Sequence, residues 1–199
     1  MKKILSVILV VTILWVSGVS VFATSPDISA YKTVLDNIND EYSLKFGYVT
    51  VDASKITLEE YENKIRKLAR QQKELLDYIA LREIVFIKTD TEQNKIVPSS
   101  HVIKTRTKPT WSLGEYFTIT ATYAVYDGSR IGICRDSRIN LTIPAILANV
   151  FLTNISSPTY SVIDGGRTST VQYTTTVHFD SIFGIDNVLL YTEFYYSDE

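Results

Sequence analysis

The spacing of apolar residues changes from helical to strand-like midway along this chain of 199 residues. From Ser25 to about Ile84 they recur at steps of three and four, which places them on one face of a helix. From about Phe117 to Tyr196 they alternate with polar residues, as in a half-buried strand. The change predicts an α+β protein, in which an N-terminal amphipathic helix pair precedes an antiparallel β-sandwich-like region.

Residues 1–23 have the layout of a secretory signal peptide. Lys2-Lys3 gives a positive start, a mostly apolar run follows from Ile4 to Val16, and Val21-Phe22-Ala23 provides a cleavage site. From Ile4 onward twenty residues carry no charge, so an uncleaved membrane anchor is the alternative. Small and polar residues at 17–20 make the end of this segment less apolar, and no Lys or Arg directly follows it. Both features favour cleavage. The protein is therefore expected to be secreted or associated with the cell envelope.

The remaining chain is expected to have three segments. These are a helical region over 24–84, a linker or edge strand over 85–110, and the antiparallel β region over 111–199. The first helix is predicted to begin near Ser25-Pro26-Asp27, with the proline in the first helical position. The second begins at a capping box formed by Thr57 and Glu60.

Both predicted helices carry one narrow apolar stripe, which Gln72 interrupts in the second helix. Packing of the two helices on each other or on the sheet explains the stripes. A seam that joins two copies of the chain, as in a coiled coil, is the alternative. Between the helices, Phe46 to Val51 is expected to form a short extended piece.

Four segments of the second half have strand patterns: Phe117–Val125, Arg138–Ile143, Thr168–Phe179 and Val188–Tyr196. Asp127-Gly128 and Asp164-Gly165-Gly166 are typical turn sequences between strands. The apolar run from Ala145 to Leu152 fits a short helix or a buried strand, because periodicity does not separate the two over so short a length.

Charge and cysteine content limit the expected partners. Without Lys2 and Lys3 the chain has 18 basic and 22 acidic residues, a net charge of −4. The basic residues are dispersed, so no nucleic acid is expected as a partner, and the membrane only through an uncleaved leader. Cys134 is the single cysteine. The chain therefore has no internal disulfide and must be stabilised by its core.

No cofactor-binding, metal-binding or catalytic motif occurs in the sequence, so no cofactor is expected and the protein is predicted not to be an enzyme. Gly132-Ile133-Cys134-Arg135 resembles the cysteine motif of bacterial L,D-transpeptidases, but isoleucine stands where that family has polar residues and glycine. Cys134 and His178 thus support only an alternative function, a cell-wall hydrolase or transpeptidase. That function requires the two side chains to lie within hydrogen-bond reach.

Two further polar patterns have ordinary structural explanations. His178-Phe179-Asp180 would place an imidazole and a carboxylate on one strand face, which suits general-base work or a metal. A third ligand is not indicated, so an ordinary strand histidine is expected. Aspartates near predicted turns could suggest calcium, but turn formation explains them. They are Asp127, Asp136, Asp164, Asp180 and Asp186.

Aromatic residues are the remaining functional signal. The chain has 13 tyrosines and two tryptophans, many of them in the β half. Exposed tyrosine and tryptophan side chains stack on sugar rings or anchor a protein partner, although tyrosine is also a favoured strand residue. The candidate ligand-binding aromatics are Trp111, Tyr126, Tyr191 and Tyr195.

The chain resembles uncharacterised secreted proteins of Gram-positive bacteria. The resemblance rests on Lys2-Lys3, on the segment Thr57 to Glu62, and on Ile163 to Thr168. It implies a signal peptide, short N-terminal helices and a Thr- and Tyr-rich β region, and it brings no known active site. The expected function is a non-enzymatic extracellular or cell-envelope module that binds a partner protein or a glycan. An oligomer formed through the helix stripes is a further alternative.

Overall fold

The computed structural model describes residues 27–81, 84–85, 101–126 and 130–197. The first half contains α2 (Ile28–Tyr42), β1 (Gly47–Val51), α3 (Leu58–Leu81), β2 (Ile84–Val85), β3 (His101–Pro109) and β4 (Phe117–Tyr126). The second half contains β5 (Arg130–Leu141), α4 (Ile143–Leu147), β6 (Val150–Thr153), β7 (Thr159–Ile163), β8 (Thr168–Phe179) and β9 (Phe183–Tyr195). The leader at 1–23 and the predicted Asp127-Gly128 turn lie outside the described residues.

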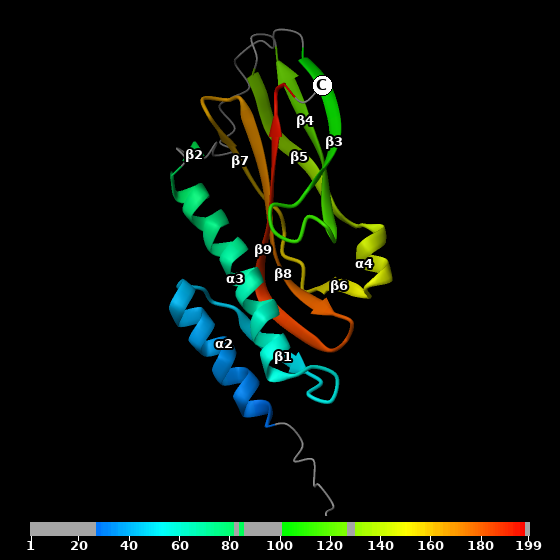
Figure 1. The fold of residues 1–199 in the computed structure, drawn as a ribbon. Coiled ribbons are helices and arrows are strands. Elements are labelled where there is room, and N and C mark those ends of the chain that lie inside the picture. Colours follow the sequence, from blue (N-terminus) through cyan, green and yellow to red (C-terminus); the bar gives the residue numbers. More distant parts are fainter. Residues whose placement is uncertain (1–26, 82–83, 86–100, 127–129, 198–199) are drawn as a thin grey trace, which may run out of the picture.

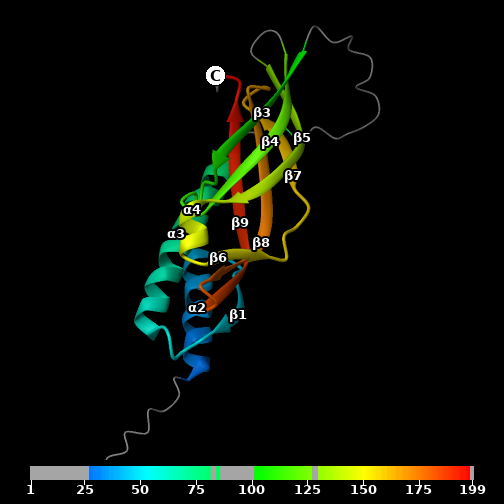
Figure 2. The ribbon, with the colours of Figure 1, turned by 90° about the vertical axis from the view of Figure 1, so that its right-hand side faces the viewer.

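The strands form two antiparallel, curled sheets (Figure 1). The larger has six strands in the order β1-β9-β8-β7-β2, with β6 beside the other part of β8. The smaller has the order β3-β4-β5. Helices α2 and α3 lie along one face of the larger sheet, and the smaller sheet lies on its other side (Figures 1 and 2). The predicted mixture of a helix pair with antiparallel strands is confirmed.

The helix stripes face the protein's own core. Tyr31, Leu35 and Ile38 of α2 and Tyr61 and Ile65 of α3 are buried, and they belong to one apolar cluster with residues of both sheets. This confirms the prediction that the stripes pack within the chain. Burying such side chains is the main favourable term in folding, so one continuous core stabilises a chain without a disulfide.

The ends of the helices follow local hydrogen bonding. The capping box is confirmed: Glu60 N donates to Thr57 Oγ1 at 3.2 Å, and Thr57 N donates to Glu60 Oε2 at 3.0 Å. The first helix begins at Ile28, two residues beyond the predicted proline position. Asp27 is its N-cap, because the carboxylate accepts from Ser29 N at 2.9 Å.

Most strand predictions agree with the structure. The expected alternation is confirmed in β4, where Phe117, Ile119, Ala121 and Tyr123 are buried. The prediction for Thr168–Phe179 matches β8, and Asp164-Gly165-Gly166 is a turn with positive φ at all three residues. The run from Ala145 to Leu152 contains both predicted alternatives: the end of α4, then most of β6.

Two strands from the N-terminal half join the larger sheet. The extended piece expected over Phe46 to Val51 is present as β1, which pairs with β9, and β2 pairs with β7. Strand β3, within 85–110, forms the edge of the smaller sheet. Strand pairing between distant segments mixes the two halves, and sequence periodicity carries no information about such pairing. Among the described residues, no helix is long and apolar enough to span a membrane.

One edge of β9 is covered by a side chain and a loop. Strand β1 pairs only with Phe183–Asp186, so the later backbone groups need other partners. Gln72, buried in α3, accepts from Leu189 N at 2.9 Å and donates to Leu189 O at 2.8 Å. Next along the edge, Trp111 N donates to Tyr191 O at 2.8 Å.

We call residues Thr110–Gly114 the strap, because they cross the edge of β9 from the smaller sheet toward α3. Ser112 Oγ donates to Leu189 O at 3.1 Å and accepts from Gln72 Nε2 at 2.6 Å. Leu113 has φ +60°, and a Cβ on Gly114 would lie 2.5 Å from Thr110 O. The tight return of the strap therefore requires glycine at 114.

The Gln72 amide predicts a measurable loss of stability in Gln72→Leu. The substitution leaves the part-buried Leu189 N–H without its acceptor, so we expect the free energy of unfolding to fall by about 1–3 kcal/mol. Urea unfolding followed by circular dichroism measures the change. Gln71→Leu is the matched control on the next, half-buried position of α3. Equal stabilities for the two variants would show that the edge of β9 does not depend on Gln72.

Candidate functional site

A hollow of about 240 Å³ lies where β3, the strap and β9 meet. We call it the aromatic hollow. It is lined by Lys108, Pro109, Trp111, Tyr191, Thr192, Glu193 and Tyr195. The Trp111 side chain is 46% exposed, and its ring packs against the Tyr78 ring of α3 with centroids 4.5 Å apart. A large aromatic surface is therefore held in a fixed position beside solvent.

A buried carboxylate organises the tyrosines of the hollow. Glu193 is 6% exposed. Its Oε1 accepts from Tyr191 Oη at 2.7 Å, and its Oε2 accepts from Tyr78 Oη at 3.0 Å and from Tyr195 Oη at 2.5 Å. A carboxylate is tolerated in such a place only with hydrogen-bond donors. Because each hydroxyl donates its hydrogen bond to Glu193, the hydroxyl oxygen acts only as an acceptor toward any other group. Tyr191 is 4% exposed, whereas Tyr78 and Tyr195 are half-buried, so these two present more of their surface to solvent.

Lysine supplies the positive charge of the hollow. Lys108 Nζ lies 4.4 Å from the centroid of the Tyr195 ring, within the range of a cation–π interaction. The hollow thus combines an exposed indole, hydroxyl groups of known orientation, one carboxylate and one ammonium. Such a set suits recognition of a polar ligand that also has an apolar face.

Three of the four predicted aromatics come together in the hollow. Trp111, Tyr191 and Tyr195 line it, whereas Tyr126 lies beside His101 at the far end of β4. Pairing of β3 with β4 runs from His101–Tyr126 to Pro109–Thr118, so Tyr126 is about 25 Å from the hollow at the usual rise per residue.

Sequence reasoning missed three members of the site: Tyr78, Lys108 and Glu193. A signal for Glu193 was available, because Tyr191, Glu193 and Tyr195 alternate along one strand and must share a face. No such signal existed for Tyr78, which comes from α3, 115 residues before Glu193 in sequence. Its inclusion depends on the packing of α3 against β9.

Cys134 and His178 do not form a catalytic pair. Cys134 is 3% exposed and lies beside Ser169, whose Oγ donates to Sγ at 3.4 Å. His178 stands at the other end of β8, stacked on Phe151 with ring centroids 4.7 Å apart. Ser169 and His178 are separated along β8 by about 30 Å at the usual rise per residue. The geometry that a hydrolase or transpeptidase of this type requires is absent at these two residues.

The His178–Asp180 pattern also separates into different contacts. His178 Nε2 lies 2.8 Å from Thr153 Oγ1, while Asp180 Oδ1 accepts from Asn149 Nδ2 at 3.1 Å. Two of the other turn aspartates accept hydrogen bonds from threonines: Asp164 from Thr168, and Asp186 from Thr176. Within the described ranges, no group of three or more His, Cys, Asp or Glu side chains is placed to hold a metal ion.

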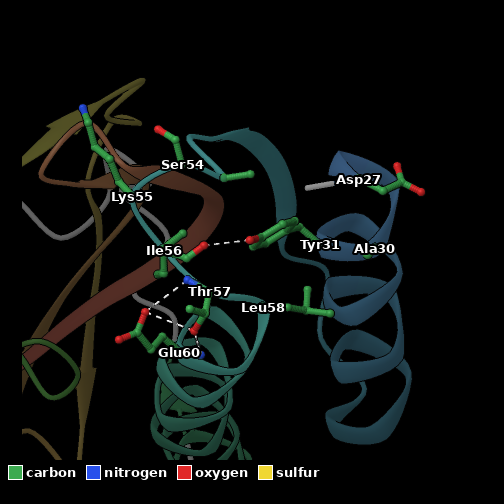
Figure 3. A pocket seen from close by; sticks show the side chains of 10 residues that line it. Asp27, Ala30, Tyr31, Ser54, Lys55, Ile56, Thr57, Leu58 and Glu60 are labelled. Carbon is green, nitrogen blue, oxygen red and sulfur yellow. Dashed lines mark hydrogen bonds between the residues drawn. The ribbon is translucent and has the colours of Figure 1, made fainter. Parts of the chain in front are cut away.

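A second hollow, of about 450 Å³, lies at the N-terminal ends of α2 and α3 (Figure 3). Its polar groups already serve the fold. Tyr31 Oη donates to Ile56 O at 2.7 Å, and Glu60 is engaged in the capping box. Asp27 caps α2. This hollow therefore holds helix-capping groups, and the aromatic hollow is the stronger candidate site.

Comparison with models of known protein families gives no match. Searches of curated proteins and of solved structures likewise give no match. The function of the chain is therefore inferred from the geometry and chemistry of its own residues.

Burial of Cys134 predicts a slow reaction with thiol reagents. Burial raises the pKa of the Cys134 thiol to about 11, despite the hydrogen bond from Ser169, which lowers the pKa. The reactive thiolate should then be about a hundredfold scarcer at pH 8 than in an ordinary cysteine. We expect alkylation by iodoacetamide, followed by mass spectrometry, to be at least a hundredfold slower in the folded protein than in urea.

The folded protein should react faster only as the pH approaches 11, since the thiol is protonated below its raised pKa. Cys134 is the only cysteine, so the whole signal comes from this side chain. Rapid alkylation of the folded protein at pH 8 would contradict the buried, protonated state and would restore Cys134 as a candidate nucleophile.

Proposed function

We propose that the protein is an exported, non-enzymatic module of the extracellular space or cell envelope that binds a glycan at the aromatic hollow. Export is the expectation from the leader sequence and from the resemblance to secreted proteins of Gram-positive bacteria. The observation that carries the proposal is the convergence of Trp111, Tyr191 and Tyr195 around the buried carboxylate of Glu193.

Each part of the hollow matches a part of a sugar. A pyranose ring has an apolar face of C–H groups, which packs on an aromatic face such as that of Trp111. Its hydroxyls are hydrogen-bond donors, and the half-buried Tyr195, whose hydroxyl donates to Glu193, can accept from them through its oxygen. The contacts of Glu193 fix the tyrosine rings before a ligand arrives, which lowers the entropy lost on binding.

The single carboxylate favours binding over hydrolysis. Glycoside hydrolysis in most families uses two carboxyl groups on opposite sides of the scissile bond. Among the described residues that line the hollow, Glu193 is the only acidic one, and both of its oxygens accept hydrogen bonds from tyrosines. This arrangement supports a structural role for the carboxylate in shaping the site.

The proposal includes a finer description of the fold. We take the two sheets as the layers of a sandwich, with the aromatic hollow at its open side between the edge strand β3 and the part of β9 that β1 does not cover. Contacts between the sheets support this description, since Ser137 of β5 lies within 3.0 Å of Tyr160 Oη and 2.6 Å of Tyr173 Oη. A site at an open side can admit an internal segment of a long glycan chain.

Trp111→Ala tests the proposed function. Loss of the indole removes a stacking surface worth about 1.5–3 kcal/mol, so we expect the affinity for the bound glycan to fall about tenfold or more. Binding to purified cell-wall material and to a glycan array measures the effect. Tyr126→Ala is the matched control, because it removes a predicted aromatic outside the hollow.

Circular dichroism and thermal melting of both variants establish that the fold is intact. Failure of the wild-type protein to bind any glycan would overturn the proposal. Equal glycan binding by Trp111→Ala and the wild-type protein would show that the glycan binds outside the aromatic hollow. Binding of a protein partner at the hollow, with no glycan bound, would favour the other expected type of ligand.

A further inference from the structure

Three basic residues alternate along β3 and lead away from the aromatic hollow. Lys104, Arg106 and Lys108 occupy every second position of the strand, so they share one face and follow one another at about 6.6–6.8 Å. All three are half-buried. Lys108 is at the hollow itself, over the Tyr195 ring. We call these residues the basic row.

The first two members of the row have no acidic partner among the described residues. Neither Lys104 nor Arg106 takes part in a salt bridge of the structure's described part. The adjacent strand β4, Phe117–Tyr126, contains no charged residue. In addition, Arg106 Nε is buried and has no hydrogen-bond partner there. A buried donor left unpaired costs about 1–3 kcal/mol. Because Nε itself is closed to solvent, an acceptor on a ligand would reach this half-buried side chain at the terminal nitrogens of the guanidinium.

We propose that the basic row extends the aromatic hollow into a site for an anionic glycan polymer. This inference depends on the proposed function, since the hollow holds one sugar of the chain on Trp111. The acid groups of neighbouring units then bind Lys108, Arg106 and Lys104 in turn. Arginine presents a planar pair of donors to a carboxylate or phosphate, and such charge-assisted bonds are stronger than neutral ones.

The charge distribution supports an anionic ligand over a cationic one. The 199-residue chain has a net charge of −2, so the row is a local feature against an acidic background. A cationic ligand would compete with Lys108, which already lies over Tyr195.

Protection of the β3 edge explains why basic residues occur there, because inward-pointing charges prevent strands from adding to a sheet. It does not explain why Lys104 and Arg106 have no acidic partner among the described residues. A bound acid group would supply that partner at the accessible part of each side chain.

Arg106→Gln is the decisive variant, with Arg70→Gln as its control. Both remove one positive charge, and Arg70 is an exposed residue of α3 outside the row. Isothermal titration is carried out with a uronic-acid polymer, a glycerol-phosphate polymer and a neutral glucan. We expect Arg106→Gln to weaken binding of an anionic polymer about tenfold or more, Lys104→Gln to weaken it less, and Arg70→Gln to leave it unchanged.

The salt dependence and the other ligands distinguish the possible failures. Affinity for the anionic polymer should fall as salt rises, whereas affinity for a neutral glucan should not. Preference for the uronic-acid or the phosphate polymer identifies the acid group. Equal binding of neutral and anionic glycans by the wild-type protein would overturn the role of the row and leave the proposed function intact. Binding of no glycan would overturn both. Equally tight binding of a DNA oligonucleotide would show a non-specific cationic surface and overturn the inference.

Discussion

The long edge of β9 is the constraint on which the rest of the structure depends. This strand pairs with β8 over nearly its whole length, but β1 covers only the start of its other edge. The remaining backbone groups lie between α3 and the strap, where unpaired donors and acceptors would be costly. Gln72 and Ser112 satisfy Leu189 together. Their bonds bring a helix, a strand and a loop of the smaller sheet to a single point.

The same arrangement positions the candidate site. Trp111 directly precedes Ser112, so the hydrogen bonds of the strap hold the indole beside β9. Tyr78 lies less than two helical turns beyond Gln72 on α3, which brings its ring under the indole and its hydroxyl to Glu193. The site is therefore formed by rigid elements on two sides, with a loop whose path is fixed by glycine at 114. Such rigidity suits a binding surface that keeps its shape without a ligand.

Sequence reasoning succeeded where the determining contacts are local. The Thr57–Glu60 capping box spans three residues, and strand alternation in β4 and β8 is a property of consecutive residues. It failed where partners are distant. Gln72 interrupts a helical stripe because it binds Leu189, 117 residues later, and the same nonlocal packing recruits Tyr78 to Glu193. The enrichment of tyrosine and tryptophan pointed to three aromatics of the hollow, but composition alone could not separate them from Tyr126.

The shared position of the strap and Trp111 couples ligand occupancy to folding. A glycan that stacks on the indole would bind only to molecules in which the strap is hydrogen-bonded to β9. When the hydrogen bonds between the strap and β9 break, the indole is no longer held at the binding site. By mass action, such a ligand raises the melting temperature in proportion to the logarithm of its concentration. A chain without crosslinks would then be most resistant to unfolding and proteolysis where its ligand is most abundant.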